Sequence, residues 1–159
     1  MSRHWMQPIT DILVPTDFSD HARYALEYAA ELARRLGATL HILHVIEPII
    51  YPAEWGYSQV GLTELEQELH RMAQQELDKL VEALRAEGLA VRAEILHGRA
   101  SEQIVRYAQE HGIGLISIGT HGRGGLEHFL FGSTTERVLR KAPCPVLAVR
   151  LPQGEQSRG

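Results

Sequence analysis

Residues 119–135 read GTHGRGGLEHFLFGSTT, and this glycine-rich stretch lies between two segments of different character. Residues 115–118 just before it are the apolar run LISI, which predicts a buried β-strand. The residues after it predict a helix over 133–141 and a further strand, VLAV, over 146–149. A strand, a glycine-rich turn, a helix and a strand in this order are typical of an α/β fold.

The same alternation extends back to residue 9. Short apolar runs predict strands at residues 9–14, 39–46 and 89–96, and the segments between them carry apolar side chains at helical spacing. The helix starts are predicted from capping residues, which are Ser19 or Asp20, Thr63 with Glu66, and Ser101. Five strands separated by helices predict an α/β fold with a doubly wound parallel sheet and helices on both faces.

Length and composition restrict the class of protein. A chain of 159 residues suits a single domain over 1–159, with 1–8 and 152–159 as loose tails. A net charge of −4 gives no global positive field, so we expect no nucleic-acid partner. The apolar runs are too short to cross a bilayer, and the single cysteine, Cys144, excludes an internal disulfide framework. We therefore expect a cytoplasmic protein without a membrane partner.

Two predicted turns are expected to share one crevice. In an open doubly wound sheet, ligands bind outside the carboxyl ends of the strands, where the strand order reverses. The turn after the first strand reads PTDFS, residues 15–19, and the turn after the fourth is the glycine-rich stretch. If the first and fourth strands are neighbours, both turns open into the same crevice.

The glycine-rich stretch has the chemistry of a phosphate-binding loop. Glycine lets backbone N–H groups approach an anion closely. Gly132 and Ser133 precede a helix, so N–H groups and the helix dipole would face a phosphate. The hydroxyls of Ser133 and Thr134 and the guanidinium of Arg123 add donors. The glycines could also form only a flexible turn, but their number and the Ser-Thr pair favour phosphate binding.

The familiar nucleotide motifs are absent from the sequence. A P-loop needs a lysine directly before its Ser or Thr, and none precedes Ser133. A dinucleotide fingerprint would follow the first strand, where residues 15–20 read PTDFSD instead. These observations argue against an NAD site and against ordinary P-loop hydrolysis.

The glycine spacing carries a family resemblance. Gly119, Gly122, Gly132 and Ser133 fit the pattern Gly-x2-Gly-x9-Gly-Ser/Thr. Together with ILVPTDFS, LHVIEP and KAPCPVLAVR, this pattern resembles the ATP-binding branch of the universal stress protein family over about residues 8–150. The resemblance implies a Rossmann-like sheet of five parallel strands in the order 3-2-1-4-5, which makes the first and fourth strands neighbours.

The resemblance also implies an adenine nucleotide, ATP or else ADP or AMP, in that crevice. Asp17 would accept hydrogen bonds from the ribose hydroxyls close to Gly119, and the backbone of Val45 would meet the adenine edge. Pro15 and Ile118 would pack against the base. The phosphates would carry Mg²⁺ or Mn²⁺, held largely by the nucleotide and water. The N–H groups implied for the phosphates are those of Gly122, Gly132, Ser133 and Thr134.

The remaining candidates at the crevice are less specific. Thr16 lies in the same turn as Asp17, and His121 lines the nucleotide mouth or faces solvent. Asp17 could instead cap the following helix, and the two roles could coexist. His41 and His44 are three apart on a strand and are expected to face opposite sides. No spacing in the sequence supports a metal site built by the protein.

The first functional hypothesis is therefore a nucleotide-binding stress-response or signalling module whose state is read by an unknown protein partner. The alternative is a slow ATPase, or an enzyme that transfers a phosphoryl or nucleotidyl group, with Ser133 or Thr134 as autophosphorylation sites. No residue is assigned as a general base over a γ-phosphate, which favours the first hypothesis. The last strand, 146–149, would be an apolar sheet edge. The resemblance implies that it pairs with its copy in a homodimer.

Overall fold

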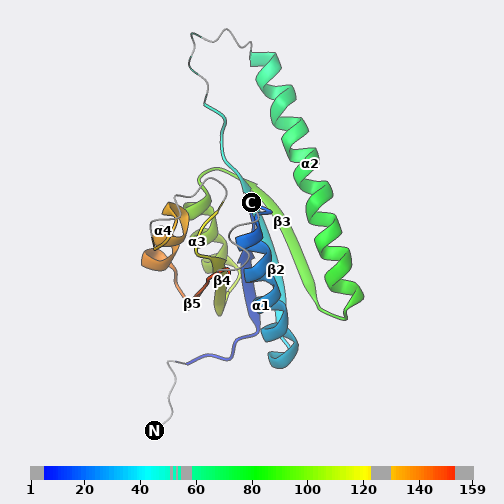
Figure 1. The fold of residues 1–159 in the computed structure, drawn as a ribbon, viewed down its shortest axis with the longest axis vertical. Coiled ribbons are helices and arrows are strands. Elements are labelled where there is room, and N and C mark those ends of the chain that lie inside the picture. Colours follow the sequence, from blue (N-terminus) through cyan, green and yellow to red (C-terminus); the bar gives the residue numbers. More distant parts are fainter. Residues whose placement is uncertain (1–5, 51, 53, 55–58, 123–129, 153–159) are drawn as a thin grey trace.

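The computed structural model describes residues 6–50, 52, 54, 59–122 and 130–152. These residues form a parallel sheet in the order β3-β2-β1-β4-β5, which confirms the predicted fold (Figure 1). The elements in chain order are β1 (Asp11–Pro15), α1 (Asp20–Leu36), β2 (Thr39–Ile46), α2 (Gln59–Ala86), β3 (Val91–His97), α3 (Ala100–Glu110), β4 (Leu115–Gly119), α4 (Ser133–Lys141) and β5 (Val146–Val149).

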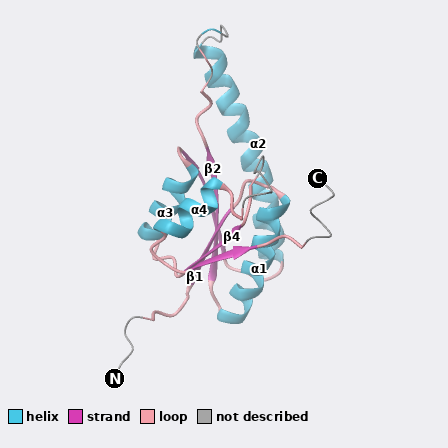
Figure 2. Ribbon diagram, turned by 60° about the vertical axis from the view of Figure 1, so that its left-hand side comes forward, coloured by secondary structure: helices cyan, strands magenta, loops and turns pink. Residues whose placement is uncertain are grey.

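Helices cover both faces of the sheet (Figure 2). Alternate residues of a strand face opposite sides, so β1 contributes Ile12 and Val14 to one face and Leu13 to the other. The first face packs on α1 and α2, and the second packs on α3 and α4. Two apolar cores with one sheet between them hold the carboxyl ends of the strands in place.

The ends of α1 follow the expected chemistry. The Ser19 hydroxyl accepts a hydrogen bond from the amide of Ala22 at 3.2 Å, so Ser19 is the N-cap. Gly37 ends the helix at a φ of 66°, a left-handed conformation that costs glycine little. Asp17 is therefore not the cap of this helix, and that alternative reading of Asp17 is wrong.

Two predicted helix starts are also wrong. The structure begins α2 at Gln59 and not at Thr63, because Leu62 extends the apolar stripe of the helix by another turn. The start of α3 has Arg99 at the N-cap position with no side-chain cap hydrogen bond, and Ser101 lies inside the first turn, buried. The amide of Ala100 is instead bound by a side chain from a distant part of the chain, described with the site below.

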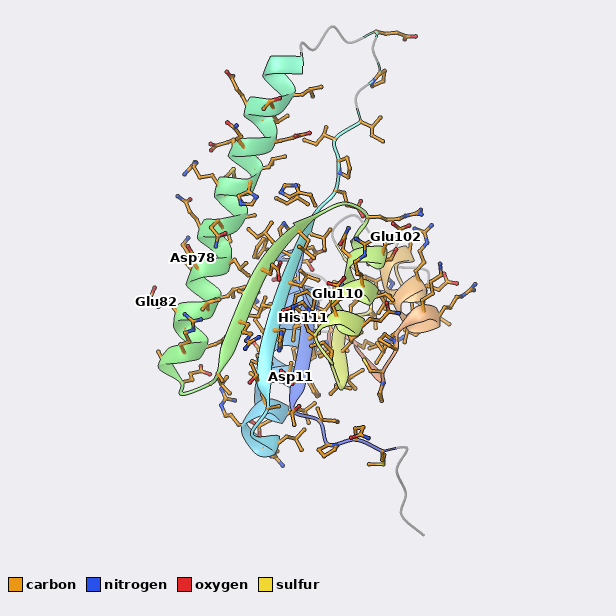
Figure 3. All side chains as sticks on the ribbon, turned by 180° about the vertical axis from the view of Figure 1, so that it is seen from behind. Asp11, Asp78, Glu82, Glu102, Glu110 and His111 are labelled. Carbon is orange, nitrogen blue, oxygen red and sulfur yellow. The ribbon has the colours of Figure 1, made fainter. Side chains whose placement is uncertain are left out.

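A partly buried polar network lies near the amino ends of β1 and β2. His41 is 1% exposed, and its Nε2 lies 2.7 Å from Asp11 Oδ1 while its Nδ1 lies 2.8 Å from the Tyr107 hydroxyl. Burial raises the pKa of Tyr107 to about 12, so this hydroxyl keeps its proton at neutral pH. The Tyr107 ring also stacks on the His111 ring, with 3.8 Å between the two ring centroids. Figure 3 labels Asp11 and His111 on the side of the sheet that α3 covers.

This network predicts a contribution of Asp11 to stability that depends on pH. Burial raises the pKa of Asp11, but the hydrogen bonds from His41 and Thr10 and the charges of His41 and Arg92 outweigh it, so the pKa is lowered. The carboxylate therefore stabilises the fold above about pH 4, and this contribution is lost as the pH falls through the lowered pKa.

We expect Asp11→Asn to reduce the free energy of unfolding at pH 7 and to flatten its dependence on pH below about 4. Urea unfolding at a series of pH values measures this. Asp78→Asn, on the exposed outer side of α2 (Figure 3), is the control. If the free energy of unfolding of the wild type and of Asp11→Asn changed with pH in parallel, the role given to Asp11 would be refuted.

Candidate functional site

The carboxyl ends of β1, β2 and β4 open into one cavity of about 440 Å³. This size lies within the range of about 300–1,000 Å³ that is usual for small-molecule sites. The residues that the sequence singles out and that line the cavity are Pro15, Thr16, Asp17, Val45, Ile118, Gly119, His121, Gly122, Gly132, Ser133 and Thr134. Arg123 lies outside the described residues. The structure thus brings the two predicted turns to one place.

Strand alternation explains which side chains enter the cavity. On β1, Leu13 lies in the core under α3, and Pro15 and Asp17 follow it at intervals of two residues. On β2, Leu43 lies in the same core, and Val45 follows it into the cavity. The cavity is therefore the continuation of the core under α3 and α4 beyond the ends of the strands.

The turn after β1 holds the Asp17 carboxylate in one orientation. Asp17 Oδ1 accepts a hydrogen bond from the amide of Ser19 at 3.0 Å. Phe18, between them, has a φ of 64°, a left-handed conformation that costs a residue with a side chain about 1 kcal/mol or more. His44 supports the turn through a 2.7 Å contact between its Nδ1 and the Thr16 carbonyl oxygen. Backbone strain at this turn is typical of a functional position.

Asp17 and Gly122 lie side by side in the lining of the cavity. A Cβ atom built on Gly122 would lie 2.6 Å from Asp17 Oδ2, which is closer than two such atoms can approach. The Oδ2 atom therefore faces the backbone of the loop after β4. A residue with a Cβ at position 122 would have to displace the Asp17 carboxylate from this place in the cavity.

The backbone after β4 is fixed on both sides. A Cβ on Gly119 would lie 2.9 Å from the backbone carbonyl atoms of His21, so β4 and α1 pack together through glycine. The Thr135 hydroxyl donates to the Gly119 carbonyl at 2.7 Å, and the Gly132 amide donates to the Thr120 carbonyl at 2.7 Å. The Gly132 N–H, implied by the resemblance to hold a phosphate, is thus engaged within the loop in this structure.

Two helices begin at the cavity, and their first turns differ. The first turn of α4 has Gly132 at the N-cap position and no side-chain cap hydrogen bond. At α3, Glu47 Oε1 accepts the hydrogen bond of the Ala100 amide at 3.0 Å, although the two residues are 53 positions apart. The positive end of the α3 dipole thus faces a carboxylate of the protein, whereas that of α4 faces the cavity.

The charges around the cavity are mainly negative. Within the described part of the chain, its ionisable lining side chains are Asp17, Glu47 and His121, and no described lysine or arginine lines it. An anion in this cavity would therefore be bound by backbone amides and the α4 dipole rather than by a cationic side chain.

Sequence reasoning missed several lining residues. Glu47 could have been found, because it continues the two-residue alternation Leu43-Val45-Glu47 past the end of β2. The others come from helices and core positions without a sequence signal, and they are Ala22, Leu43, Ala100, Ile104 and Thr135.

Other reactive side chains lie outside the cavity. His41 and His44 do contact different partners on opposite sides of β2, as their spacing predicts. Burial raises the pKa of the Cys144 thiol, so at neutral pH it stays protonated and is a poor nucleophile. Among the described residues, no group of three or more histidine, cysteine or carboxylate side chains could hold a metal ion. None of the described helices is both long enough and apolar enough to cross a membrane.

Comparison with known proteins decides the family. A sequence model described as the universal stress protein family matches residues 8–150. The chain belongs to the universal stress protein family. The universal stress protein MJ0531 of Methanocaldococcus jannaschii is 36% identical to it over 148 residues, which cover 91% of this chain and 84% of that protein.

Solved structures of universal stress proteins share the fold. The structure of MJ0577 from the same organism is 30% identical and superposes with a TM-score of 0.82, covering 92% of this chain and 99% of that chain. A universal stress protein from Archaeoglobus fulgidus, solved in complex with dAMP, is 26% identical with a TM-score of 0.61 and covers 89% of this chain and 98% of that one. A structural relative of this universal stress protein therefore binds an adenine nucleotide.

Proposed function

We propose that this universal stress protein binds an adenine nucleotide in the cavity at the ends of β1, β2 and β4. In this proposal the chain is a stress-response or signalling module, and a protein partner responds to whether the nucleotide is bound. The observation that carries it is the amino end of α4, which has no side-chain cap and lines the same cavity of about 440 Å³ as Asp17 and Gly122. The relative that binds dAMP supports the choice of an adenine nucleotide.

In this proposal the phosphates bind at the amino end of α4. The amides of Ser133 and Thr134 lie in the first turn of this helix, where backbone N–H groups have no partner within the helix. Gly122 lines the same cavity, and because it has no side chain it allows close approach of a phosphate. Mg²⁺ or Mn²⁺ would be carried by the phosphates and water.

The ligand carried by the protein tests this proposal directly. We expect mass spectrometry of the purified protein to detect ATP, ADP or AMP, and calorimetry to show binding of each phosphorylated form. Adenosine, which lacks phosphates, should bind at least about tenfold more weakly than ATP, because the amides at α4 then have no anion to bind. Equal affinity for adenosine and ATP would contradict a phosphate site at α4.

Asp17 is placed to bind the ribose. Its Oδ1 is held by the Ser19 amide, and its Oδ2 faces the cavity beside Gly122. We expect Asp17→Ala to lower the affinity for ATP by about tenfold or more, because a hydrogen bond to a charged group contributes about 1.5–3 kcal/mol. The affinity for 2′,3′-dideoxy-ATP, which lacks the ribose hydroxyls, should fall much less. Titration calorimetry measures both. Asp20→Ala, which removes an exposed carboxylate outside the cavity, is the control, and equal losses for the two nucleotides would exclude a diol contact.

The β5 edge is the proposed homodimer interface. In the described chain β5 pairs with β4, and the sheet order leaves its other edge open. Apolar edge strands of this kind pair readily with a second copy. We expect Leu147→Lys to shift the protein toward the monomer in sedimentation. Leu36→Lys, at the end of α1, should leave the sedimenting species at the wild-type mass. A dimer that persists in Leu147→Lys would place the interface elsewhere.

A further inference from the structure

Glu47 is a carboxylate in a cavity proposed to bind an anion. It directly follows β2, and the alternation Leu43-Val45-Glu47 turns its side chain toward α3. Its Oε1 accepts the hydrogen bond of the Ala100 amide at 3.0 Å, which fixes the carboxylate at the amino end of α3. A carboxylate has about four acceptor positions, and the described residues supply one hydrogen bond to it. The remaining acceptor positions can meet a ligand.

Glu47 is exposed, and the cavity walls beside it are apolar. These walls come from β2 and α3 and include Leu43, Val45, Ala100 and Ile104. A planar base fits such walls, whereas a phosphate would be repelled by the Glu47 carboxylate.

The strand order separates Glu47 from the phosphate end. Because β1 lies between β2 and β4, the ends of β2 and β4 are about two strand spacings, roughly 10 Å, apart. The uncapped end of α4 follows β4, so a nucleotide with its phosphates at α4 extends its base toward β2 and Glu47.

We propose that Glu47 selects the base by accepting a hydrogen bond from the 6-amino group of adenine. This inference rests on the proposed nucleotide site. An ionised carboxylate accepts hydrogen bonds and donates none. Adenine presents an amino donor at position 6, whereas guanine presents a carbonyl oxygen there. Hypoxanthine has the same carbonyl oxygen, so Glu47 binds adenine nucleotides and repels the other two purines.

The test compares nucleotides that differ only in the base. Calorimetry with ATP, ITP and purine riboside triphosphate, which has hydrogen in place of the 6-amino group, measures the selectivity. We expect the wild type to prefer ATP over each analogue by at least about tenfold, the net value of a hydrogen bond to a charged group.

Glu47→Gln supplies the matched variant. Its amide oxygen can still accept from Ala100, so the end of α3 is preserved, and its NH₂ group can donate to the carbonyl oxygen of hypoxanthine. We expect the ratio of ATP to ITP affinity to fall below about threefold. Glu102→Gln, in the first turn of α3 but outside the cavity (Figure 3), should keep the wild-type ratio.

The outcomes separate this inference from the proposed function. If the wild type binds ATP and both analogues equally, the role of Glu47 is overturned and the nucleotide site stays intact. A Glu47→Gln variant that keeps the wild-type ratio of ATP to ITP affinity would lead to the same conclusion. A wild type that binds none of the three triphosphates would overturn both proposals. The wild-type comparison needs no variant, so it stands even if Glu47→Gln does not fold.

Discussion

Gly122→Val is expected to reduce ATP affinity by about a hundredfold or more, a loss of about 2.7 kcal/mol, while the protein remains folded. The Cβ alone would lie 2.6 Å from Asp17 Oδ2, so the valine must displace the carboxylate and narrow the phosphate end of the cavity. Gly122 is exposed at the surface, so the two apolar cores are not disturbed.

Calorimetry with ATP measures this loss, and thermal unfolding checks the fold. Gly61→Val, at an exposed position in the first turn of α2, makes the same change outside the cavity and should bind ATP as the wild type does. An unchanged affinity in Gly122→Val would show that the phosphates do not pass between this loop and Asp17.

Gly119→Ala is expected to lower the free energy of unfolding by about 1–3 kcal/mol, the usual cost of overpacking a close contact. The added Cβ would lie 2.9 Å from the backbone carbonyl of His21, and a backbone cannot move aside as a flexible side chain can. The shift of α1 should also weaken ATP binding, because Ser19 and Asp17 precede this helix directly.

Gly132→Ala is the matched control for this stability measurement. A Cβ there meets its nearest atom at 3.6 Å, and Gly132 has a φ of −68°, which any residue adopts. We expect Gly132→Ala to lower the free energy of unfolding in urea by less than about 1 kcal/mol, which is the cost of alanine at an N-cap. Equal destabilisation by the two variants would contradict the assigned contact between β4 and α1.

The sheet could be predicted from the sequence because its signals are local. The apolar runs of β2 and β5 and the helix α4 have the bounds that the pattern predicts. The order of the strands came from the family resemblance, since local patterns do not specify which strands pair. The capping pattern of Thr63 with Glu66 predicts the start of α2 too late, because the helix already begins at Gln59.

The cavity could be predicted only in part. Asp17 and Gly122 follow strand ends, and the topology brings all such ends to one edge of the sheet. Ala100 and Ile104 lie on α3, and their place in the cavity depends on how that helix packs. The sequence predicts Ser101 as the cap of α3, because a capping side chain as distant in sequence as Glu47 leaves no local sequence pattern at the helix start.

A crystal structure of the protein grown with excess Mg-ATP tests the central claim most directly. We predict phosphate oxygens within hydrogen-bond distance of the backbone amides of Ser133 and Thr134, with the ribose beside Asp17. An empty cavity under these conditions, or a triphosphate bound away from the start of α4, would contradict the claim.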